Sequence, residues 1–428
     1  MLNKQKILII GSGGREHAVG WKIKQSGRCG GIFFAPGNAG TLSLGMNVDI
    51  KATDIEGLLS FAKKESINLT LALPDDPLAL GVVNLFRENG LRIFGPTKEA
   101  AMLESSKAFA KNFMRNYRLP TAKFKTFTDF TDAKSYVDRQ SLPIVIKASG
   151  LALGKGVIIA QNMKEAHKAL EDILVKKIFG DAGNEVVIEE FMTGPEVSTH
   201  AFSDGITYKL FPISQDHKRV GEGDTGPNTG GMGTITPLPF INEELIQTIN
   251  TEIVAPTFEA MRAEDTAFEG VLYPGLMLTP SGPKILEYNA RFGDPETQIY
   301  MRLLETDLLD IIDACIDKKL SDIEIKWKKK ACCNIVIASG GYPNAYEKGK
   351  VISGIEEAEL NHDIIVFHAG TAMKENILVT NGGRVLGVSA VADTLEKALK
   401  LAYDAVPKIS FEGMQYRKDI GQKAQKLL

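Results

Sequence analysis

The sequence predicts a mixed α/β and α+β protein whose first domain is a doubly wound parallel sheet. Strand and helix signals alternate over residues 6–103, which is typical of a parallel sheet with helices on both faces. A compact, sheet-rich unit follows at about 121–191, and the basic run 326–330 precedes a final region of about 100 residues. The 428 residues leave room for roughly three domains. We expect them to span 1–103, 104–325 and 326–428.

Each element of the first domain has its own signal. Short apolar runs predict strands at residues 7–10, 32–34, 69–73 and 92–94. The segments between them predict helices that begin near Glu16, Asp54 and Leu78. Gly95-Pro96-Thr97 ends the alternation, and a helix from about Lys98 leads into the second domain.

The second domain is expected to include a small mobile lid at about 121–191. Strands are predicted near 124–127, 143–147, 157–160 and 186–190. A small unit of this kind can hinge over a ligand. Longer strands and helices return from residue 192 to about 325. The final region is expected to be an independent α+β unit, with Cys332 and Cys333 on a buried strand.

Composition excludes several classes of protein. The formal net charge is −3 and the basic residues are dispersed, so neither nucleic acid nor an anionic membrane is expected as a partner. The four cysteines form no CxxC pair, which favours a reduced compartment. The apolar run Ile7 to Ile10 is too short for a signal peptide, and no later run reaches the length of a spanning helix. We therefore expect a cytoplasmic protein.

A glycine-rich turn, Gly11-Ser12-Gly13-Gly14-Arg15-Glu16-His17, follows the first predicted strand. It opens a helix, where free N–H groups and the helix dipole favour a phosphate. Two details oppose a dinucleotide: Glu16 replaces the last glycine of the fingerprint, and the second strand ends at Ala35-Pro36-Gly37-Asn38 without an acidic residue. A mono-phosphorylated ligand clamped by Arg15 is favoured, with a tight turn that binds nothing as the alternative.

Two more glycine-rich segments could approach phosphates. Lys147 precedes the hairpin 150–156, which could cap a nucleotide or be a plain flexible hairpin; it is not a Walker A loop. The segment QDHKR at 215–219 leads into a loop with five glycines between 223 and 233. Such a loop lets its backbone come close to a ligand, or lets the loop move. Its basic triplet is alternatively a solvated surface cluster.

A metal site is predicted at Glu287 and Asn289. Both residues end an apolar strand, and because side chains alternate along a strand they lie on one face. Two oxygen ligands suit Mg²⁺, which keeps waters and substrate phosphates in its other positions. An ordinary polar loop is the alternative.

In this order, the segments resemble the phosphoribosylamine-glycine ligases, or glycinamide ribonucleotide synthetases, of the ATP-grasp superfamily. The resemblance covers nearly the whole chain. It rests on GSGGREHA at 11–18, APGNAG at 35–40, FGPTKEAA at 94–101, GLALGKGV at 150–157, QDHKR at 215–219, GPNTGGMG at 226–233, NARFGDPETQ at 289–298 and SGGYP at 339–343.

The resemblance implies a carbon-nitrogen ligase of de novo purine synthesis that joins glycine to 5-phosphoribosylamine. ATP would phosphorylate the glycine carboxylate, and the amine would displace phosphate from glycyl phosphate to give glycinamide ribonucleotide. Such chemistry needs charge around the moving phosphoryl group and the exclusion of water. The implied cofactors are ATP and Mg²⁺, with Mn²⁺ as an alternative. A monomer is expected, with a homodimer as the alternative.

The family motifs also imply roles for single residues. The ATP phosphates would contact Lys107, Lys147, Gly154, Lys155 and Gly156, the adenine Glu189, Glu190 and Phe191, and the ribose Glu196. The metal would be held by Glu287 and Asn289, and the catalytic residues would be Arg291, Asp216 and Lys218, with Arg291 at the acyl phosphate and Asp216 at the glycine ammonium. The phosphoribosyl part would contact Gly11, Gly13, Gly14, Arg15, Pro36, Gly37, Asn38 and Asp75. Asp294 and Glu296 would fix the loop that carries Arg291.

Two segments depart from the family pattern. Leu73-Pro74-Asp75-Asp76 stands where the family usually reads GPE, which puts the contacts of Asp75 in doubt. The lid reads KASGLALGKG where KADGLAAGKG is usual, with Ser149 for Asp and Leu153 for Ala. Lys147 is kept, so nucleotide binding is expected to persist.

Three other functions are compatible with parts of the sequence. A different ATP-grasp ligase would share the lysines and the metal residues but not NARFGDPETQ and GPNTGGMG. An inactive nucleotide-binding regulator is disfavoured because the lysines, Glu287, Asn289 and Arg291 are all present together. A nicotinamide-dependent oxidoreductase is disfavoured by the missing acidic residue after the second strand.

Overall fold

The N-terminal part of the chain forms a five-stranded parallel sheet in the order β3-β2-β1-β4-β5. The computed structural model describes residues 4–152 and 156–426. The strands are β1 (Gln5–Gly11), β2 (Cys29–Pro36), β3 (Met46–Asn47), β4 (Leu69–Ala72) and β5 (Ile93–Phe94). The predicted doubly wound sheet is confirmed, and the short edge strand β3 is an addition to it.

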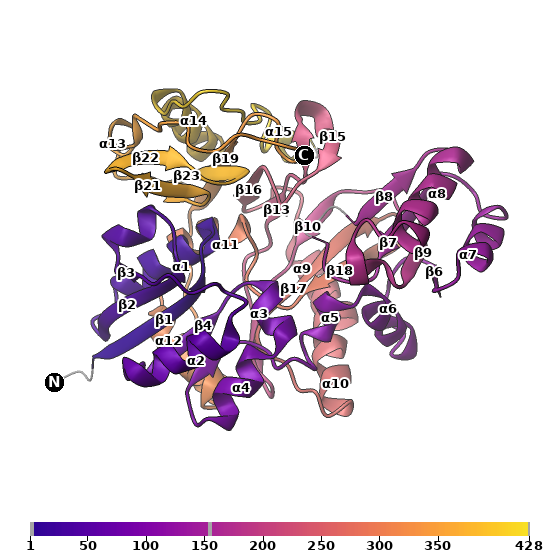
Figure 1. The fold of residues 1–428 in the computed structure, drawn as a ribbon, viewed down its shortest axis with the longest axis horizontal. Coiled ribbons are helices and arrows are strands. Elements are labelled where there is room, and N and C mark those ends of the chain that lie inside the picture. The colour runs from indigo at the N-terminus through magenta and orange to yellow at the C-terminus, as the bar shows by residue number, and fades with distance from the viewer. Residues whose placement is uncertain (1–3, 153–155, 427–428) are drawn as a thin grey trace.

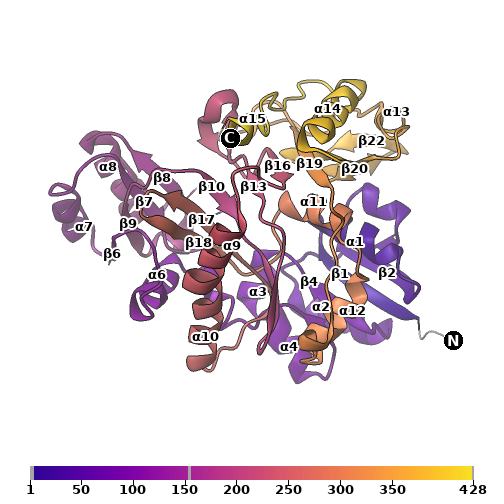
Figure 2. The same ribbon diagram turned by 180° about the vertical axis from the view of Figure 1, so that it is seen from behind.

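The two faces of this sheet are covered by helices from different parts of the chain. Alternate residues of β1 face opposite sides. Leu8 and Ile10 pack with α2 (Ile55–Lys64) and α4 (Val82–Glu88). Ile7 and Ile9 share a core with α1 (Gly14–Lys24) and with α12 (Leu308–Ile316), which lies beside β1 in Figures 1 and 2. The first sheet is therefore completed by a helix from about 200 residues further along the chain.

The middle of the chain forms a second sheet, in which the long strand β17 (Glu269–Thr279) pairs with three neighbours. These are β10 (Glu196–Ser198), β11 (Ala201–Asp204) and β18 (Gly282–Asn289), and β12 (Tyr208–Leu210) continues from β11. The helices of this part are α5 (Met102–Ser105), α6 (Lys107–Asn116), α9 (Glu243–Ile249), α10 (Ala255–Ala263) and α11 (Glu296–Leu303).

The lid has its own sheet and its own core. Its antiparallel strands run in the order β6-β9-β7-β8 and project at the right of Figure 1. They are β6 (Phe124–Phe127), β7 (Ile144–Ala148), β8 (Val157–Ala160) and β9 (Val186–Glu190), with α7 (Phe130–Val137) and α8 (Met163–Leu170). Buried residues such as Ala133, Ile146, Leu170 and Ile188 form a separate hydrophobic cluster. The four strands match the predicted positions.

The C-terminal region forms an α+β domain, as predicted, but it is not independent of the rest of the chain. Its sheet has the order β13-β16-β19-β23-β20, and two strands, β13 (Gln215–Asp216) and β16 (Gly233–Thr236), come from the middle of the chain. The fully buried β19 (Ala331–Ala338) needs a partner on each side, and β16 supplies one of them. Cys332 and Cys333 lie on this buried strand, as predicted.

The remaining elements complete the structure. The sheet continues with β23 (Arg384–Ala392) and β20 (Ile364–His368), and two hairpins pair β14 (Arg219–Gly221) with β15 (Thr225–Asn228) and β21 (Thr371–Lys374) with β22 (Ile377–Thr380). The other helices are α3 (Asp75–Leu80), α13 (Ile355–Ala358), α14 (Leu395–Ala405) and α15 (Gln422–Gln425). No helix within the described ranges is long and apolar enough to cross a membrane.

Candidate active site

A cavity of about 560 Å³ lies where the lid, the middle sheet, the first domain and the C-terminal sheet meet. Side chains from all four parts line it, so the site exists only in the complete fold. Of the residues predicted from the sequence, the lining includes Arg15, Asp75, Lys107, Lys147, Gly156, Glu189, Glu190, Phe191, Glu196, Asp216, Lys218, Glu287, Asn289 and Arg291.

The other predicted residues lie elsewhere. Gly154 and Lys155 fall outside the described residues. Within the described ranges, the lining does not include Gly11, Gly13, Gly14, Pro36, Gly37 or Asn38. The N–H of Gly13 already donates to Glu16 Oε2 at 2.5 Å, and Arg15 Nε donates to Glu16 Oε1 at 2.6 Å. A buried glutamate thus occupies the helix terminus where the sequence predicts a phosphate.

Asn38 makes hydrogen bonds that hold the backbone of neighbouring turns. Its Nδ2 donates to the carbonyl oxygens of Ser12 and His368, each at 2.9 Å, and its Oδ1 accepts from Gly40 N at 2.9 Å. These bonds connect the turn after β2 to the glycine-rich turn and to β20. The predicted contact of Asn38 with a substrate stays a prediction, and Arg15 and Asp75 are the members of this group that line the cavity.

The lysines of the nucleotide motifs surround a buried glutamate. Lys147 on β7 and Lys111 on α6 both pair with Glu189 on β9, at Nζ to carboxylate distances of 2.9 Å and 3.2 Å. Lys107 Nζ donates to the carbonyl oxygen of Gly150, at the base of the lid hairpin, at 3.0 Å. Lys111 is missing from the sequence prediction, although its position one helical turn after Lys107 is a usable signal. Burial lowers the pKa of Lys111 to about 8, against the opposing charge of Glu189.

Lys218 joins two carboxylates at the same end of the cavity. Its Nζ lies 3.1 Å from Glu287 Oε1 and 3.5 Å from Glu196 Oε2. The ammonium of Lys218 lowers the pKa of Glu287 to about 2, against the effect of burial, and Lys147 and Lys107 add to this shift. Burial opposes the charge on Lys218 itself, but Glu287, Glu196 and Asp216 raise its pKa overall. Glu287 is therefore held ionised, as a metal ligand must be.

A β-bulge directs Glu287 into the cavity. Gly275 pairs with Glu287 and Leu276 with Ile285, so Leu286 is an extra residue without a partner on β17. Ile285 and Tyr288 are buried in the hydrophobic core, with Tyr288 also bordering the cavity, whereas Glu287 and Asn289 line the cavity without joining the core. Strict alternation from Ile285 would have placed Glu287 in the core. Bulges next to active sites often re-aim a side chain in this way.

The donor set of Glu287 and Asn289 fits a hard cation that is only partly bound by protein. One carboxylate and one amide oxygen line the cavity from the same strand. Among the described residues, no group of three or more His, Cys, Asp or Glu side chains could hold a metal alone. Mg²⁺ is commonly bound through one or two carboxylates together with substrate phosphates and water, so the pair is sufficient.

Arg291 is held by a glutamate that the sequence prediction does not include. Its Nη2 lies 2.9 Å from Glu104 Oε1 and 3.1 Å from Asn289 Oδ1. The second oxygen of Glu104 accepts from Ala290 N at 2.8 Å. Burial and then Asp75 raise the pKa of Glu104 to about 7, against the charge of Arg291. Glu104 comes from α5, and its pairing across 187 positions has no local signal in the sequence.

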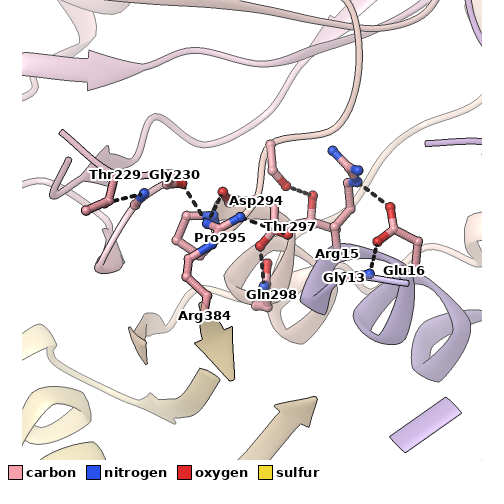
Figure 3. A network of polar contacts seen from close by, with 12 residues as sticks. Gly13, Arg15, Glu16, Thr229, Gly230, Asp294, Pro295, Thr297, Gln298 and Arg384 are labelled. Atoms are coloured by element: carbon pink, nitrogen blue, oxygen red, sulfur yellow. Dashed lines mark hydrogen bonds and ion pairs between the residues drawn. The ribbon is translucent and has the colours of Figure 1, made fainter. Parts of the chain in front are cut away.

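Two acidic residues, Asp216 and Glu296, lie beside Arg291. Both line the cavity, and Ser198 Oγ donates to Glu296 Oε1 at 3.0 Å. Burial and then Glu296 raise the pKa of Asp216 well above its usual range, against the charges of Lys218 and Arg384. Asp294 is paired with Arg384 and accepts from Gln298 Nε2 at 2.9 Å (Figure 3). The architectural role predicted for Asp294 and Glu296 stays a prediction; both residues also face the cavity.

One part of the cavity is apolar. Side chains from the lid strands and from the β17–β18 hairpin line it, namely Val145, Val157, Ile159, Met277 and Leu286. Phe191, directly after β9, lies at the same part of the cavity and is 39% exposed. An apolar slot beside fixed ammonium groups can accept an aromatic base with a phosphate tail.

Comparisons with known proteins cover the whole architecture. Models of the phosphoribosylglycinamide synthetase N domain, ATP-grasp (A) domain and C domain match residues 5–104, 105–297 and 332–423. A phosphoribosylamine-glycine ligase of Vibrio vulnificus is 51% identical over 421 residues, which cover 98% of each chain. The crystal structure of such a ligase from Thermotoga maritima has a TM-score of 0.83 at 36% identity and covers 97% of this chain and 99% of that one.

A more distant match shows the fold alone. The biotin carboxylase domain of a 2-oxoglutarate carboxylase from Hydrogenobacter thermophilus, solved with MgADP, has a TM-score of 0.72 at 14% identity, covering 99% of this chain and 93% of that one. The relatives that are about 50% identical to this chain match it over almost its whole length. They therefore cover all three domains and all the motifs that line the cavity. The chain belongs to the phosphoribosylglycinamide synthetase family.

Proposed function

We propose that this protein is an ATP-dependent ligase that joins glycine to 5-phosphoribosylamine and releases glycinamide ribonucleotide, ADP and phosphate. The observation that carries the proposal is that one cavity brings four lysines and Glu287 next to Arg291 and Asp216. The first group suits a nucleotide phosphate chain, and the second suits an amino acid with a carboxylate and an ammonium group. Family membership supports this pairing of substrates.

The proposed reaction has two steps. A carboxylate oxygen of glycine attacks the γ-phosphorus of ATP, the bond to the β-phosphate oxygen breaks, and ADP leaves. The amine nitrogen of phosphoribosylamine then attacks the carbonyl carbon of glycyl phosphate, the C–O bond to phosphate breaks, and the nitrogen loses a proton. The family resemblance does not call for a side-chain nucleophile, so the protein contributes charge, orientation and the exclusion of water.

Different residues of this chain would supply the charge, the orientation and the exclusion of water. Lys107, Lys147 and Lys218 would neutralise charge on the transferring phosphoryl group, and Arg291 would hold the carboxylate that becomes the acyl phosphate. Glu287 and Asn289 would hold Mg²⁺, or Mn²⁺ in its place, which supplies charge neutralisation when bound. Asp216 would hold the ammonium group of glycine. The lid strands and Phe191 would keep water from the acyl phosphate.

The cell compartment and the assembly are part of the proposal. Four free cysteines, three of them buried, support a reduced cytoplasmic environment. We propose a monomer, since one chain supplies every residue named above.

The direct test is substrate-dependent release of ADP and phosphate from MgATP. Phosphoribosylamine can be formed in the assay from ribose 5-phosphate and ammonia. We expect turnover only when glycine and phosphoribosylamine are both present, and a product with the mass of glycinamide ribonucleotide. Turnover that is no faster with both substrates than with neither would remove the proposal.

The metal site is tested separately with Glu287→Gln. The variant keeps the shape and removes one charge, so we expect a higher Mg²⁺ requirement and a loss of turnover of about 100-fold. Mn²⁺ titrations of the same proteins show which ion the site prefers. An unchanged Mg²⁺ dependence would contradict the assignment. Glu264→Gln, at an exposed position on the middle domain, is the control.

A further inference from the structure

Arg384 ties three segments of the chain together at the edge of the cavity. It is the first residue of β23, in the C-terminal sheet. Its Nη1 donates to the carbonyl oxygens of Gly230 and Asp294, each at 2.6 Å, and its Nη2 lies 3.3 Å from Asp294 Oδ2 (Figure 3). One guanidinium group therefore joins the C-terminal sheet, the glycine-rich loop 226–233 and the loop that follows Arg291.

Tyr342 holds the same peptide segment from another direction. Gly230 N donates to the Tyr342 hydroxyl oxygen at 3.0 Å. Tyr342 lies in the SGGYP segment, and both it and Arg384 line the cavity. The N–H and the C=O of Gly230 are thus both bound by side chains of the C-terminal region. This fixes the position of Gly230 more closely than either bond alone.

The residue next to Gly230 packs directly on a predicted catalytic carboxylate. Gly231 has a φ of +112°, and a Cβ atom placed there would lie 2.6 Å from Asp216 Oδ1 and 2.4 Å from Pro295 Cδ. Only glycine permits so close an approach with this backbone conformation. The position of Gly230 therefore determines how tightly the loop supports Asp216.

The same loop also supports Lys218. The Thr229 N–H and the Thr229 hydroxyl both donate to the carbonyl oxygen of Lys218, each at 2.8 Å. Gly231 N in turn donates to Thr229 Oγ1 at 2.9 Å. Thr229 to Gly231 thus form a rigid bridge between the C-terminal side chains and the strand end that carries Asp216 and Lys218.

We propose that Arg384 and Tyr342 act as a clamp from the C-terminal region that positions the glycine-rich loop against Asp216. The inference rests on the proposed function and adds to it a positioning role for these two residues in binding glycine and phosphoribosylamine. Arg384 acts through Gly230 and Asp294 and has no need to touch a substrate. Lys107 and Lys147, which would hold the ATP phosphates, bond to Gly150 and Glu189 and not to the clamp. Lys218 is the lysine that the clamped loop supports, so we expect ATP binding to depend on the clamp less than glycine binding does.

The experiment measures kcat and KM for each substrate in Arg384→Lys, Arg384→Gln and Tyr342→Phe. In Arg384→Gln we expect kcat/KM for glycine to fall roughly 10- to 100-fold while KM for ATP changes by less than about threefold, because small misplacements of a binding group cost that much. Arg384→Lys keeps the charge beside Asp294 and should recover part of this loss. Tyr342→Phe removes only one oxygen and leaves every charge in place, so it tests the clamp even if Arg384→Gln is poorly folded.

A double-mutant cycle separates positioning from general stability. Since both side chains act on Gly230, the losses of Arg384→Gln and Tyr342→Phe should not add in the double variant. Arg87→Gln is the matched control: it removes a 2.7 Å ion pair with Glu269, and neither residue lines the cavity. We expect it to lower the melting temperature without changing KM for glycine.

The possible outcomes separate a failure of the proposed clamp from a failure of the proposed function. If the wild-type protein turns over both substrates but Tyr342→Phe and both Arg384 variants keep the wild-type kcat/KM for glycine, the clamp is wrong and the ligase remains. If KM for ATP rises as much as KM for glycine, the effect is general and the clamp is also wrong. A wild-type protein without substrate-dependent turnover would instead remove the proposed function.

Discussion

The two ends of the cavity use basic residues in different ways. At the lysine end, Lys107, Lys147 and Lys218 lie around Glu287, and each ammonium is on a flexible stem. At the arginine end, Arg15, Arg291 and Arg384 are each paired with a carboxylate, at 2.6 Å from Glu16, 2.9 Å from Glu104 and 3.3 Å from Asp294. Lysine offers an adaptable point charge, whereas the planar guanidinium fixes the geometry of its partners.

The difference indicates which substrate belongs to each end. The arginine end carries three further carboxylates that line the cavity, Asp75, Asp216 and Glu296. Each of its arginines is paired with a carboxylate, and Arg291 would also hold the glycine carboxylate. Carboxylates outnumber guanidinium groups at this end, which suits amines. At the lysine end the ammonium groups of Lys147 and Lys218 are point charges paired with Glu189 and Glu287, and such point charges suit a phosphate chain.

The largest effect is expected from the loss of a lysine. Lys147→Met should lower kcat by about 1000-fold, because the donor proposed for the transferring phosphoryl group is removed while Glu189 keeps its pair with Lys111. The measurement is ADP release at saturating substrates. Lys168→Met, at an exposed position of the same lid, is the control. A loss below about tenfold would contradict the division between the two ends.

A conservative change tests the scaffold role at the arginine end. Arg291→Lys keeps the charge but replaces two fixed donors by one ammonium: Nη2 donates to Glu104 and Asn289 while Nη1 donates to the Phe292 carbonyl. We therefore expect kcat/KM for glycine to fall about 100-fold. KM for ATP should change little. Steady-state kinetics with each substrate varied in turn provide the test. Full activity in this variant would show that a point charge suffices and that the fork geometry is unimportant.

The sequence predicts the lysine end better than the arginine end, for physical reasons. Lys147 and Glu287 sit in motifs next to strands, where periodicity places them. Even so, Glu287 reaches the cavity because of a bulge that no period of two predicts. The pairs of Arg291 with Glu104 and of Arg384 with Asp294 join distant segments, so they arise from tertiary packing alone.

In the fold, too, local elements could be predicted from the sequence, whereas contacts between distant segments could not. The parallel sheet and the four lid strands follow from local patterns and are confirmed. The placement of α12 on the first sheet, and of β13 and β16 in the C-terminal sheet, depends on which apolar faces meet after folding. Local signals carry no information on such partners, so they did not reveal that the sheet of the C-terminal domain includes strands from the middle of the chain.

Two glutamates should give the two ends opposite dependences of stability on pH. The pKa of Glu104 is raised from 4.5 to about 7, so its stabilising contribution is full below pH 4.5 and is lost as pH rises through about 7. The pKa of Glu287 is lowered from 4.5 to about 2, so its contribution is present above pH 4.5 and is lost as pH falls towards 2. Each contribution is at most on the order of 3 kcal/mol.

Urea unfolding of Glu104→Gln and Glu287→Gln between pH 3 and 8 measures both contributions. Relative to Glu104→Gln, the wild-type protein should lose stability from pH 5 to 8. Relative to Glu287→Gln, it should gain stability from pH 3 to 5. The two variants serve as controls for each other, and parallel curves would show that burial and charge do not separate the two ends.

The smallest effect concerns the connection between the lid and the lysine end. Ser149 Oγ accepts a hydrogen bond from Ala108 N at 3.1 Å, beside Ser106, which caps the same helix α6 by accepting from Phe109 N at 3.2 Å. Ser149→Ala should lower the free energy of unfolding by about 1 kcal/mol, as Ser106→Ala should, because each leaves one N–H at the helix start without its partner. If Ser149 also couples the lid to Lys107, only Ser149→Ala should raise KM for ATP, by up to about fivefold at that energy. Equal KM values in the two variants, measured together with thermal unfolding, would mean that Ser149 is a helix cap and that the lysine end is positioned without it.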